Sequence, residues 1–454
     1  MLLKTRLFGQ VYSFDSVKDV LNKGSSKKSG DELVGIAAGN EQERIAAQIV
    51  ISNMQVSDFR NNPIIPYEED FVTRIIQDDL NENVYEEIKN WTIEELREFL
   101  LSDKSTERDI KRISRGLTAE TISAVCKIMG NLDLAYAARR IRNETTCNTT
   151  MGKEGILASR LQPNHPSDDP DGIRMCILEG LSYGVGDALI GINPATGSVE
   201  NTLRVLEMLN DVKERYGVPT QISYLIHANT MLEAIRQGGK TDLIFASIAG
   251  SEKANRGFGI TIELLEEAQQ VLKKHGTATG PNVLYFETGQ GPETVNNQHF
   301  GADMATLEAR TYGFAKHFNP FIVNDVTGFV GPEVQYDAKQ CIRSQLEDHF
   351  MGKLTGLPIG TDMAFSSHVK ADYDDNDVAL MVSTMAGTNY WMGVSGGSDA
   401  VDYNMESSFQ DLAALRRLCG FRVVKEFEEW CQKIGIFDEN GRLTDIAGDP
   451  SIFM

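Results

Sequence analysis

Short apolar runs recur along the last two-thirds of the chain, and each run is followed by a loop and a stretch with helical spacing. The runs cover residues 156–162, 188–193, 220–227, 241–249, 283–288, 321–326, 357–362 and 389–394. Their starts lie 21 to 42 residues apart, which suits repeated strand–helix units. Apolar residues fill the runs continuously rather than alternately, as expected of strands buried on both faces in a parallel sheet.

The stretches between the runs carry helix signals. Residues 261–275 begin with Thr261 as a cap and carry two lysines in the last turn before Gly276. Residues 229–237 form a shorter segment that explains the one 21-residue interval. Eight strand–helix units predict an α/β fold, a (β/α)8 TIM barrel. An open doubly wound sheet is the alternative, but it would usually carry a glycine-rich phosphate loop after its first strand, and none follows 156–162.

The first 150 residues show a different pattern, mainly helical. Residues 41–54 have apolar positions at helical spacing, Thr92 opens a capping box with Glu95, and Thr118 begins another helix. Residues 4–14 favour a pair of strands instead. We therefore predict an N-terminal, mainly helical packing or assembly domain at 1–150. A catalytic barrel with a C-terminal helical tail is predicted at 151–454.

Composition agrees with a large folded protein. The chain has 454 residues, 41% hydrophobic and 24% charged, enough for a barrel core with an accessory domain. A net charge of -21 disfavours nucleic-acid partners. The six cysteines have no paired spacing, which indicates reduced thiols rather than disulfides or a zinc finger. With no signal-peptide pattern after Met1 and no membrane-length apolar run, we expect a soluble, intracellular protein.

Polar residues end several of these apolar runs, and in a barrel the carboxyl ends of the strands converge on one opening. The residues in question are Arg160 and Gln162 (first run), Asn193 (second), His227 (third), Ser247 (fourth), Glu287 (fifth), Asp325 (sixth) and Asp362 (seventh). Any one of them could simply cap the next helix. Together they would gather an arginine, amides and two or three carboxylates around one site.

This set of side chains indicates a small polar cation as ligand. Glu287 and Asp362 could neutralise an ammonium group, while Arg160, Gln162 and Asn193 offer hydrogen bonds to a hydroxyl oxygen. Buried carboxylates are costly unless paired, so a cationic substrate would complete the site. A Mg²⁺ ion held by two carboxylates and water is the alternative. The seven histidines are dispersed, however, and we predict no metal ligands.

Seven strings of residues resemble the large subunit of ethanolamine ammonia-lyase. They are residues 59–63 (FRNNP), 160–164 (RLQPN), 184–187 (GVGD), 250–253 (GSEK), 285–291 (YFETGQG), 328–333 (GFVGPE) and 346–353 (LEDHFMGK). The resemblance runs from Lys4 to near the C-terminus with almost no shift in register.

The resemblance implies an adenosylcobalamin-dependent radical lyase that converts ethanolamine to acetaldehyde and ammonia. In that family an adenosyl radical takes hydrogen from the carbon that bears the hydroxyl, the amino group migrates, and ammonia is lost. Substrate binding by Arg160, Gln162, Asn193, Glu287 and Asp362 is implied, with Arg160, Glu287 and Asp362 as the catalytic residues. Apolar walls around the radical path are implied at Val326, Phe329 and Met392, although ordinary barrel core would explain these three equally well.

Cofactor contacts carry over from the resemblance only in part. Pro194, Ser247 and Phe258 match the family. Ala246, Gly257, Val295 and Val401 stand where the family has different, generally larger or more polar residues, so backbone contacts could remain there while side-chain hydrogen bonds could not. The resemblance further implies a small-subunit partner, large-subunit dimers assembled into a hexamer, and a cytoplasmic location within a bacterial microcompartment.

Residues 347–352 (EDHFMG) nearly match DxHxxG, the signature of proteins that bind cobalamin with its own base displaced. We interpret this string as the end of the helix before the seventh strand, because Gly352 and then Leu357 follow His349 closely.

Three hypotheses for the function follow. The first is the radical lyase, the second a metal-assisted barrel lyase or isomerase acting on another small polar molecule, and the third a non-catalytic scaffold. The joint presence of Arg160, Glu287 and Asp362 argues against the third.

Overall fold

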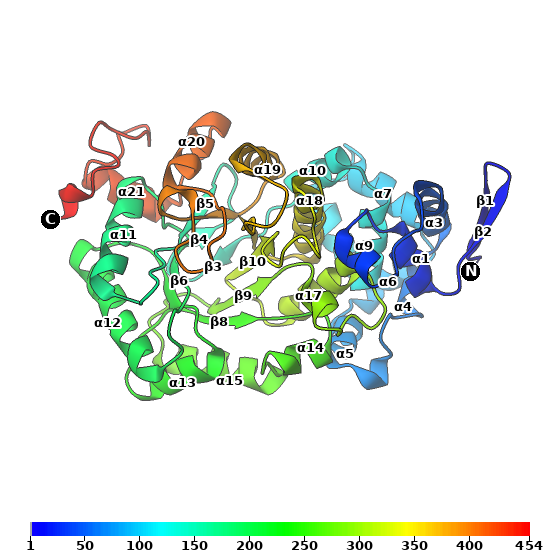
Figure 1. Cartoon of the computed structure of the whole chain (residues 1–454), viewed down its shortest axis with the longest axis horizontal. Coiled ribbons are helices and arrows are strands. Elements are labelled where there is room, and N and C mark those ends of the chain that lie inside the picture. Colours follow the sequence, from blue (N-terminus) through cyan, green and yellow to red (C-terminus); the bar gives the residue numbers. More distant parts are fainter. Residues whose placement is uncertain (1) are drawn as a thin grey trace.

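Eight parallel strands form the centre of the molecule in the computed structural model, which describes residues 2–454 (Figure 1). They are β5 (Ala158–Leu161), β6 (Leu189–Ile192), β7 (Ile222–Tyr224), β8 (Ile244–Ser247), β9 (Leu284–Thr288), β10 (Ile322–Thr327), β11 (Ile359–Met363) and β12 (Tyr390–Gly393). Each predicted apolar run coincides with one strand, and β10 and β11 extend one residue beyond their runs. The order across the sheet is β7-β6-β5-β12-β11-β10-β9-β8, so the first strand pairs with the last.

The sheet closes where β7 meets β8. The Asp242 amide donates to the Ile222 carbonyl at 3.3 Å, and the Ile222 amide donates to Asp242 Oδ2 at 2.9 Å. The predicted (β/α)8 barrel is therefore confirmed, and the open doubly wound sheet is excluded.

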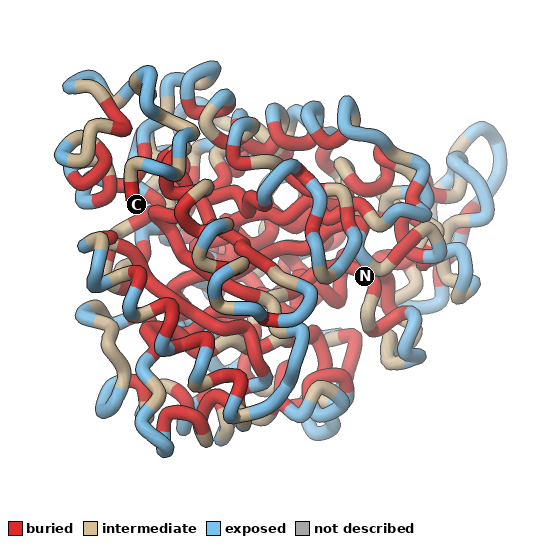
Figure 2. The backbone as a smooth tube through the Cα atoms, turned by 60° about the vertical axis from the view of Figure 1, so that its left-hand side comes forward, coloured by how far each residue is buried: buried red, intermediate tan, exposed pale blue. Residues whose placement is uncertain are grey.

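Helices surround the barrel, buried on the side that faces the strands and exposed on the other (Figure 2). They are α11 (Pro170–Ser182), α12 (Val199–Tyr216), α13 (Ala228–Arg236), α14 (Glu252–Gly257), α15 (Ile262–His275), α16 (Pro292–Val295), α17 (Met304–His317), α18 (Ala338–Thr355), α19 (Tyr373–Met385), α20 (Phe409–Cys419) and α21 (Lys425–Lys433), with 3-10 turns η2 (Ser395–Gly397) and η3 (Pro450–Phe453). Helix α15 begins at its Thr261 cap, as predicted. His349 lies inside α18 and is fully buried, which confirms that the near-match to DxHxxG is helical.

The first 150 residues are mainly helical, as predicted, and their helices lie at one side of the barrel (Figure 1). Their elements are β1 (Lys4–Leu7), β2 (Gln10–Ser13), α1 (Val17–Gly24), α2 (Ser29–Leu33), α3 (Glu41–Asn53), α4 (Val56–Arg60), η1 (Tyr67–Glu69), α5 (Phe71–Asp78), α6 (Glu82–Ile88), α7 (Ile93–Leu101), α8 (Glu107–Ser114), α9 (Ala119–Lys127), α10 (Asn131–Arg139), β3 (Thr145–Thr146) and β4 (Thr150–Met151). The Thr92–Glu95 capping box and the Thr118 cap both form. The division into domains at residue 150 stays a prediction.

Buried ion pairs join the N-terminal helices to the barrel helix α17. Arg310 on α17 donates to Asp70 and to Glu120, each at 2.7 Å, and all three side chains are buried. Burying a charged group costs desolvation free energy, which a close pair with the opposite charge offsets. This interaction therefore fixes how α5 and α9 sit against the barrel wall.

Residues 2–454 contain neither a membrane-spanning helix nor a cluster of metal-binding side chains. No helix in this range combines the length and apolar character needed to cross a bilayer. Nor does the same range contain a group of three or more His, Cys, Asp or Glu side chains arranged to hold a metal ion.

Candidate active site

Five of the predicted residues meet at the carboxyl ends of the barrel strands. Arg160, on β5, is fully buried, and its Nη1 lies 3.9 Å from Glu287 Oε2 and 3.8 Å from Asp362 Oδ2. Its Nη2 donates to Gln162 Oε1 and, at 3.1 Å, to Asn193 Oδ1. Residues separated by up to 202 positions are thus brought to one place because parallel strands end at the same rim.

Two hydrogen-bond donors of the Arg160 guanidinium are unpaired within the described chain. Its Nε and Nη1 have no hydrogen-bond partner among residues 2–454, although both atoms are buried. Unpaired buried donors cost free energy, about 1–3 kcal/mol for each group and more when it is charged. The site is therefore suited to a ligand that brings an oxygen acceptor to Arg160.

Asn324, held by Tyr390, lies within hydrogen-bonding distance of both acids. Asn324 Nδ2 lies 3.4 Å from both Glu287 Oε2 and Asp362 Oδ2, and the Tyr390 hydroxyl donates to Asn324 Oδ1 at 2.9 Å. The Tyr285 hydroxyl is 3.4 Å from Glu287 Oε2. Because Tyr390 occupies the amide oxygen of Asn324, the amide nitrogen is directed at the carboxylates.

The loop after β12 supplies acids that the sequence analysis missed. Asp399 Oδ2 accepts hydrogen bonds from Gln162 Nε2 at 2.8 Å and from Asn164 Nδ2 at 2.7 Å. Asp402 Oδ2 accepts from Asn193 Nδ2 at 3.1 Å. These contacts turn the amide oxygens of Gln162 and Asn193 toward Arg160. Their position after the eighth apolar run, where a barrel places its active-site loops, was the available signal.

Burial and crowding raise the pKa values of the two acids at the site. Burial raises the pKa of Glu287 to about 7, with Arg160 opposing the rise and Asp362 adding to it. Burial likewise raises the pKa of Asp362. Arg160 is the one cation in contact with these acids among the residues described, so the arrangement favours a positively charged ligand.

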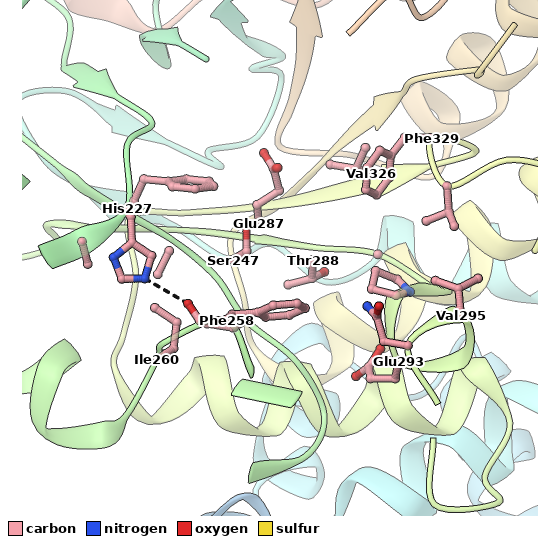
Figure 3. A pocket seen from close by; sticks show the side chains of 18 residues that line it. His227, Ser247, Phe258, Ile260, Glu287, Thr288, Glu293, Val295, Val326 and Phe329 are labelled. Carbon is pink, nitrogen blue, oxygen red and sulfur yellow. Dashed lines mark hydrogen bonds between the residues drawn. The ribbon is translucent and has the colours of Figure 1, made fainter. Parts of the chain in front are cut away.

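A cavity of about 610 Å³ opens beside Glu287, which is one of the residues that line it (Figure 3). Its walls are mainly apolar, with Phe245, Phe258, Val326 and Phe329 among them. Glu287 lies between His227 on one side and Val326 and Phe329 on the other, with Ser247 and Phe258 below it in this view (Figure 3). A space of this size holds a ligand as large as a nucleoside. Glu287 belongs both to the polar cluster around Arg160 and to the lining of this apolar cavity.

The cavity gathers part of the predicted cofactor and wall residues. Its lining includes Ala246, Ser247, Phe258, Val295, Val326 and Phe329. The lining does not include four other predicted residues, Pro194, Gly257, Met392 and Val401. Gly257 is the last residue of α14, and Met392 on β12 pairs in register with Arg160 on β5. The Val401 amide donates to Asp399 at 2.7 Å.

Two strand-end residues have other roles. His227 caps α13, since its Nδ1 accepts the Asn229 amide and its Nε2 donates to the Phe258 carbonyl at 2.9 Å. Asp325 is not part of the substrate cluster: it is in contact with Asp348 on α18, and burial with neighbouring Glu308 raises its pKa well above its usual range. Side chains alternate along a strand, so Asn324 faces the site and Asp325 faces the helices.

Comparisons with known proteins agree on one family. A family model described as "Ethanolamine ammonia lyase large subunit (EutB)" matches residues 12–446. The ethanolamine ammonia-lyase large subunit of Escherichia coli (strain K12) is 49% identical over 453 residues, covering 100% of both chains. The same protein of Salmonella typhimurium is also 49% identical, with 100% of both chains covered.

Proposed function

Since the chain belongs to the family of ethanolamine ammonia-lyase large subunits, we propose that it is the catalytic subunit of an enzyme that converts ethanolamine to acetaldehyde and ammonia. One observation carries the proposal: Arg160, Glu287 and Asp362 converge, and Glu287 also lines an apolar cavity. Ethanolamine is a small ammonium ion with a hydroxyl, and this site presents carboxylates and unpaired arginine donors together.

Each side chain has a role in holding this substrate. Glu287 and Asp362 accept hydrogen bonds from the ammonium group, and the free Nη1 and Nε donors of Arg160 meet the hydroxyl oxygen. Gln162 and Asn193 hold the guanidinium through its Nη2. The substrate's charge offsets the excess of acids, so binding is strongest when it enters as a cation.

The apolar cavity fits the adenosyl group of adenosylcobalamin. Phe258 and Ala246 would contact it on one wall and Val326 and Phe329 on the other, with Ser247 as a polar contact. When bound, the cofactor supplies a carbon-centred radical by homolysis of its cobalt–carbon bond. The apolar lining would exclude water from that radical, and Glu287 would hold the substrate at the boundary between cavity and polar site.

The family description as a large subunit supports a small-subunit partner that completes the cofactor site. We include in the proposal assembly of large-subunit dimers into a hexamer and residence in a bacterial microcompartment.

The test is ammonia release from ethanolamine by the complex reconstituted with the small subunit of the same source. We expect release that requires adenosylcobalamin, together with a cobalt–corrin absorbance that co-purifies with the complex. Release that depends on Mg²⁺ and not on the corrin would support the metal-assisted alternative. A complex that forms but releases no ammonia with either would support the scaffold hypothesis.

A further inference from the structure

Glu406 is a buried acid in the loop after β12 that none of the roles above uses. The loop is fixed to the strand end of β11, because Met405 and Phe365 exchange two backbone hydrogen bonds of 2.9 Å each. The Glu406 amide donates to the Gly397 carbonyl at 2.9 Å. Residues Glu406 and Asp362 are only 2% and 5% exposed, so neither carboxyl can rely on water.

The two carboxyl groups are close enough that each affects the pKa of the other. Asp362 Oδ1 and Glu406 Oε2 are also buried without any donor among residues 2–454. If both carboxylates were ionised, they would repel each other and both oxygens would stay unsatisfied. One proton shared between them removes the repulsion and satisfies both groups.

We propose that Glu406 is a positioning residue for the reaction: it stays protonated and donates a hydrogen bond to Asp362. The pair then carries one negative charge. Asp362 is held by Glu406 on one side, and its Oδ2 faces Arg160 and Asn324, where the substrate ammonium group would bind.

The surroundings of Glu406 favour the protonated form. Burial raises the pKa of Glu406 well above its usual range, and the charges of Asp362 and Asp399 raise it further. Arg160 is the opposing cation, and its pull is divided among Glu287, Asp362 and Glu406. The remaining titratable groups that face the pair are Tyr285, Tyr390 and Asp402, of which none supplies a positive charge.

Two variants distinguish positioning from direct binding of the substrate. In Glu406→Gln the amide can still donate to Asp362 but cannot ionise, so we expect the KM for ethanolamine to stay within about threefold of the unmodified complex. In Glu406→Leu the donor is lost, and we expect KM to rise about tenfold or more, with a smaller change in kcat. If Gln is as damaging as Leu, Glu406 acts as an ionised ligand and the proposal is wrong.

A second measurement tests the shared proton without activity. Infrared difference spectra of the folded complex at neutral pH should show a protonated carboxylic acid band that disappears in Glu406→Gln. The matched control is Glu426→Gln, at an exposed position on α21, which should leave the band unchanged. No band difference for Glu406→Gln would overturn the proposal.

The kinetic part of this inference rests on the proposed function, whereas the infrared band does not. A band that behaves as expected in a complex that releases no ammonia would mean that the proposed reaction is wrong and the acid pair is present.

Discussion

At the scale of single residues, the site depends on charges that are placed where water cannot screen them. Arg160 is fully buried between two acids, and each acid has a raised pKa. Interactions in such a place are stronger than at the surface, and removal of one partner has a larger effect.

Glu287→Gln keeps the shape of the side chain and removes its charge. We expect a folded protein whose kcat/KM for ethanolamine falls at least about 100-fold, because the ammonium group loses its charged acceptor. Ammonia release by the reconstituted complex measures this, with thermal unfolding as the check on folding and Glu426→Gln as the control. Turnover near that of the unmodified complex would remove Glu287 from its proposed role.

The pKa of about 7 for Glu287 predicts a pH dependence of substrate binding. The carboxylate form accepts from the ammonium group, so binding is present above this pKa and is lost as pH falls through it. We expect kcat/KM to fall about tenfold for each pH unit below about 7. A profile of kcat/KM that is flat from about pH 8 to about pH 6 would contradict the raised pKa.

At the scale of elements, close contacts between neighbouring strands set the geometry of the site. Gly360 on β11 lies against the ring of Tyr390 on β12: a Cβ at this position would be 2.1–2.4 Å from three ring atoms. Tyr390 in turn holds Asn324, which faces both Glu287 and Asp362. The absence of a side chain at one position therefore controls the orientation of groups on two other strands.

Gly360→Ala should disturb this chain of contacts. The methyl group must displace the Tyr390 ring or separate the strands, so we expect a lower melting temperature and a drop in kcat/KM of about tenfold or more. Gly130→Ala is the matched control, since a Cβ there meets nothing within 4 Å. Equal activity and stability of the two variants would show that Tyr390 can move without cost.

At the scale of the whole molecule, charged groups attach the N-terminal helices to the barrel. Arg310 pairs with Asp70 and Glu120 and also donates to the Gly250 carbonyl at 2.9 Å. All of these side chains are buried, and Gly250 belongs to the loop after β8, which lies next to the cavity. The packing of the first 150 residues is thus connected to the wall of the candidate active site.

Arg310→Met removes the shared cation and leaves two buried carboxylates without a partner. We expect a loss of about 3–5 kcal/mol in the free energy of unfolding, measured by denaturant titration. Arg112→Gln breaks an exposed pair with Glu87 and should cost less than about 1 kcal/mol. A similar, small loss for both variants would mean that the Arg310 cluster contributes little to the attachment.

The sequence by itself determined the fold class and the main members of the site. Continuous apolar runs of strand length, separated by capped helices, have few stable arrangements other than a barrel, and all eight runs form strands. Arg160, Gln162, Asn193, Glu287 and Asp362 could be predicted to meet because strand ends converge whatever the details of packing. The expected reaction and its cofactor came instead from the resemblance of strings such as residues 285–291 to the ethanolamine ammonia-lyase large subunit.

Only the tertiary structure decided which polar residues face the site and which acids lie close together. Asn324 and Asp325 are neighbours in one run, and strand orientation alone assigns the first to the acids and the second to α18. Asp399, Asp402 and Glu406 lie in a loop without periodicity, so no local pattern predicts their contacts. The meeting of Glu406 with Asp362 depends on how that loop packs against β11, because the protonation of a carboxyl is set by its neighbours in space.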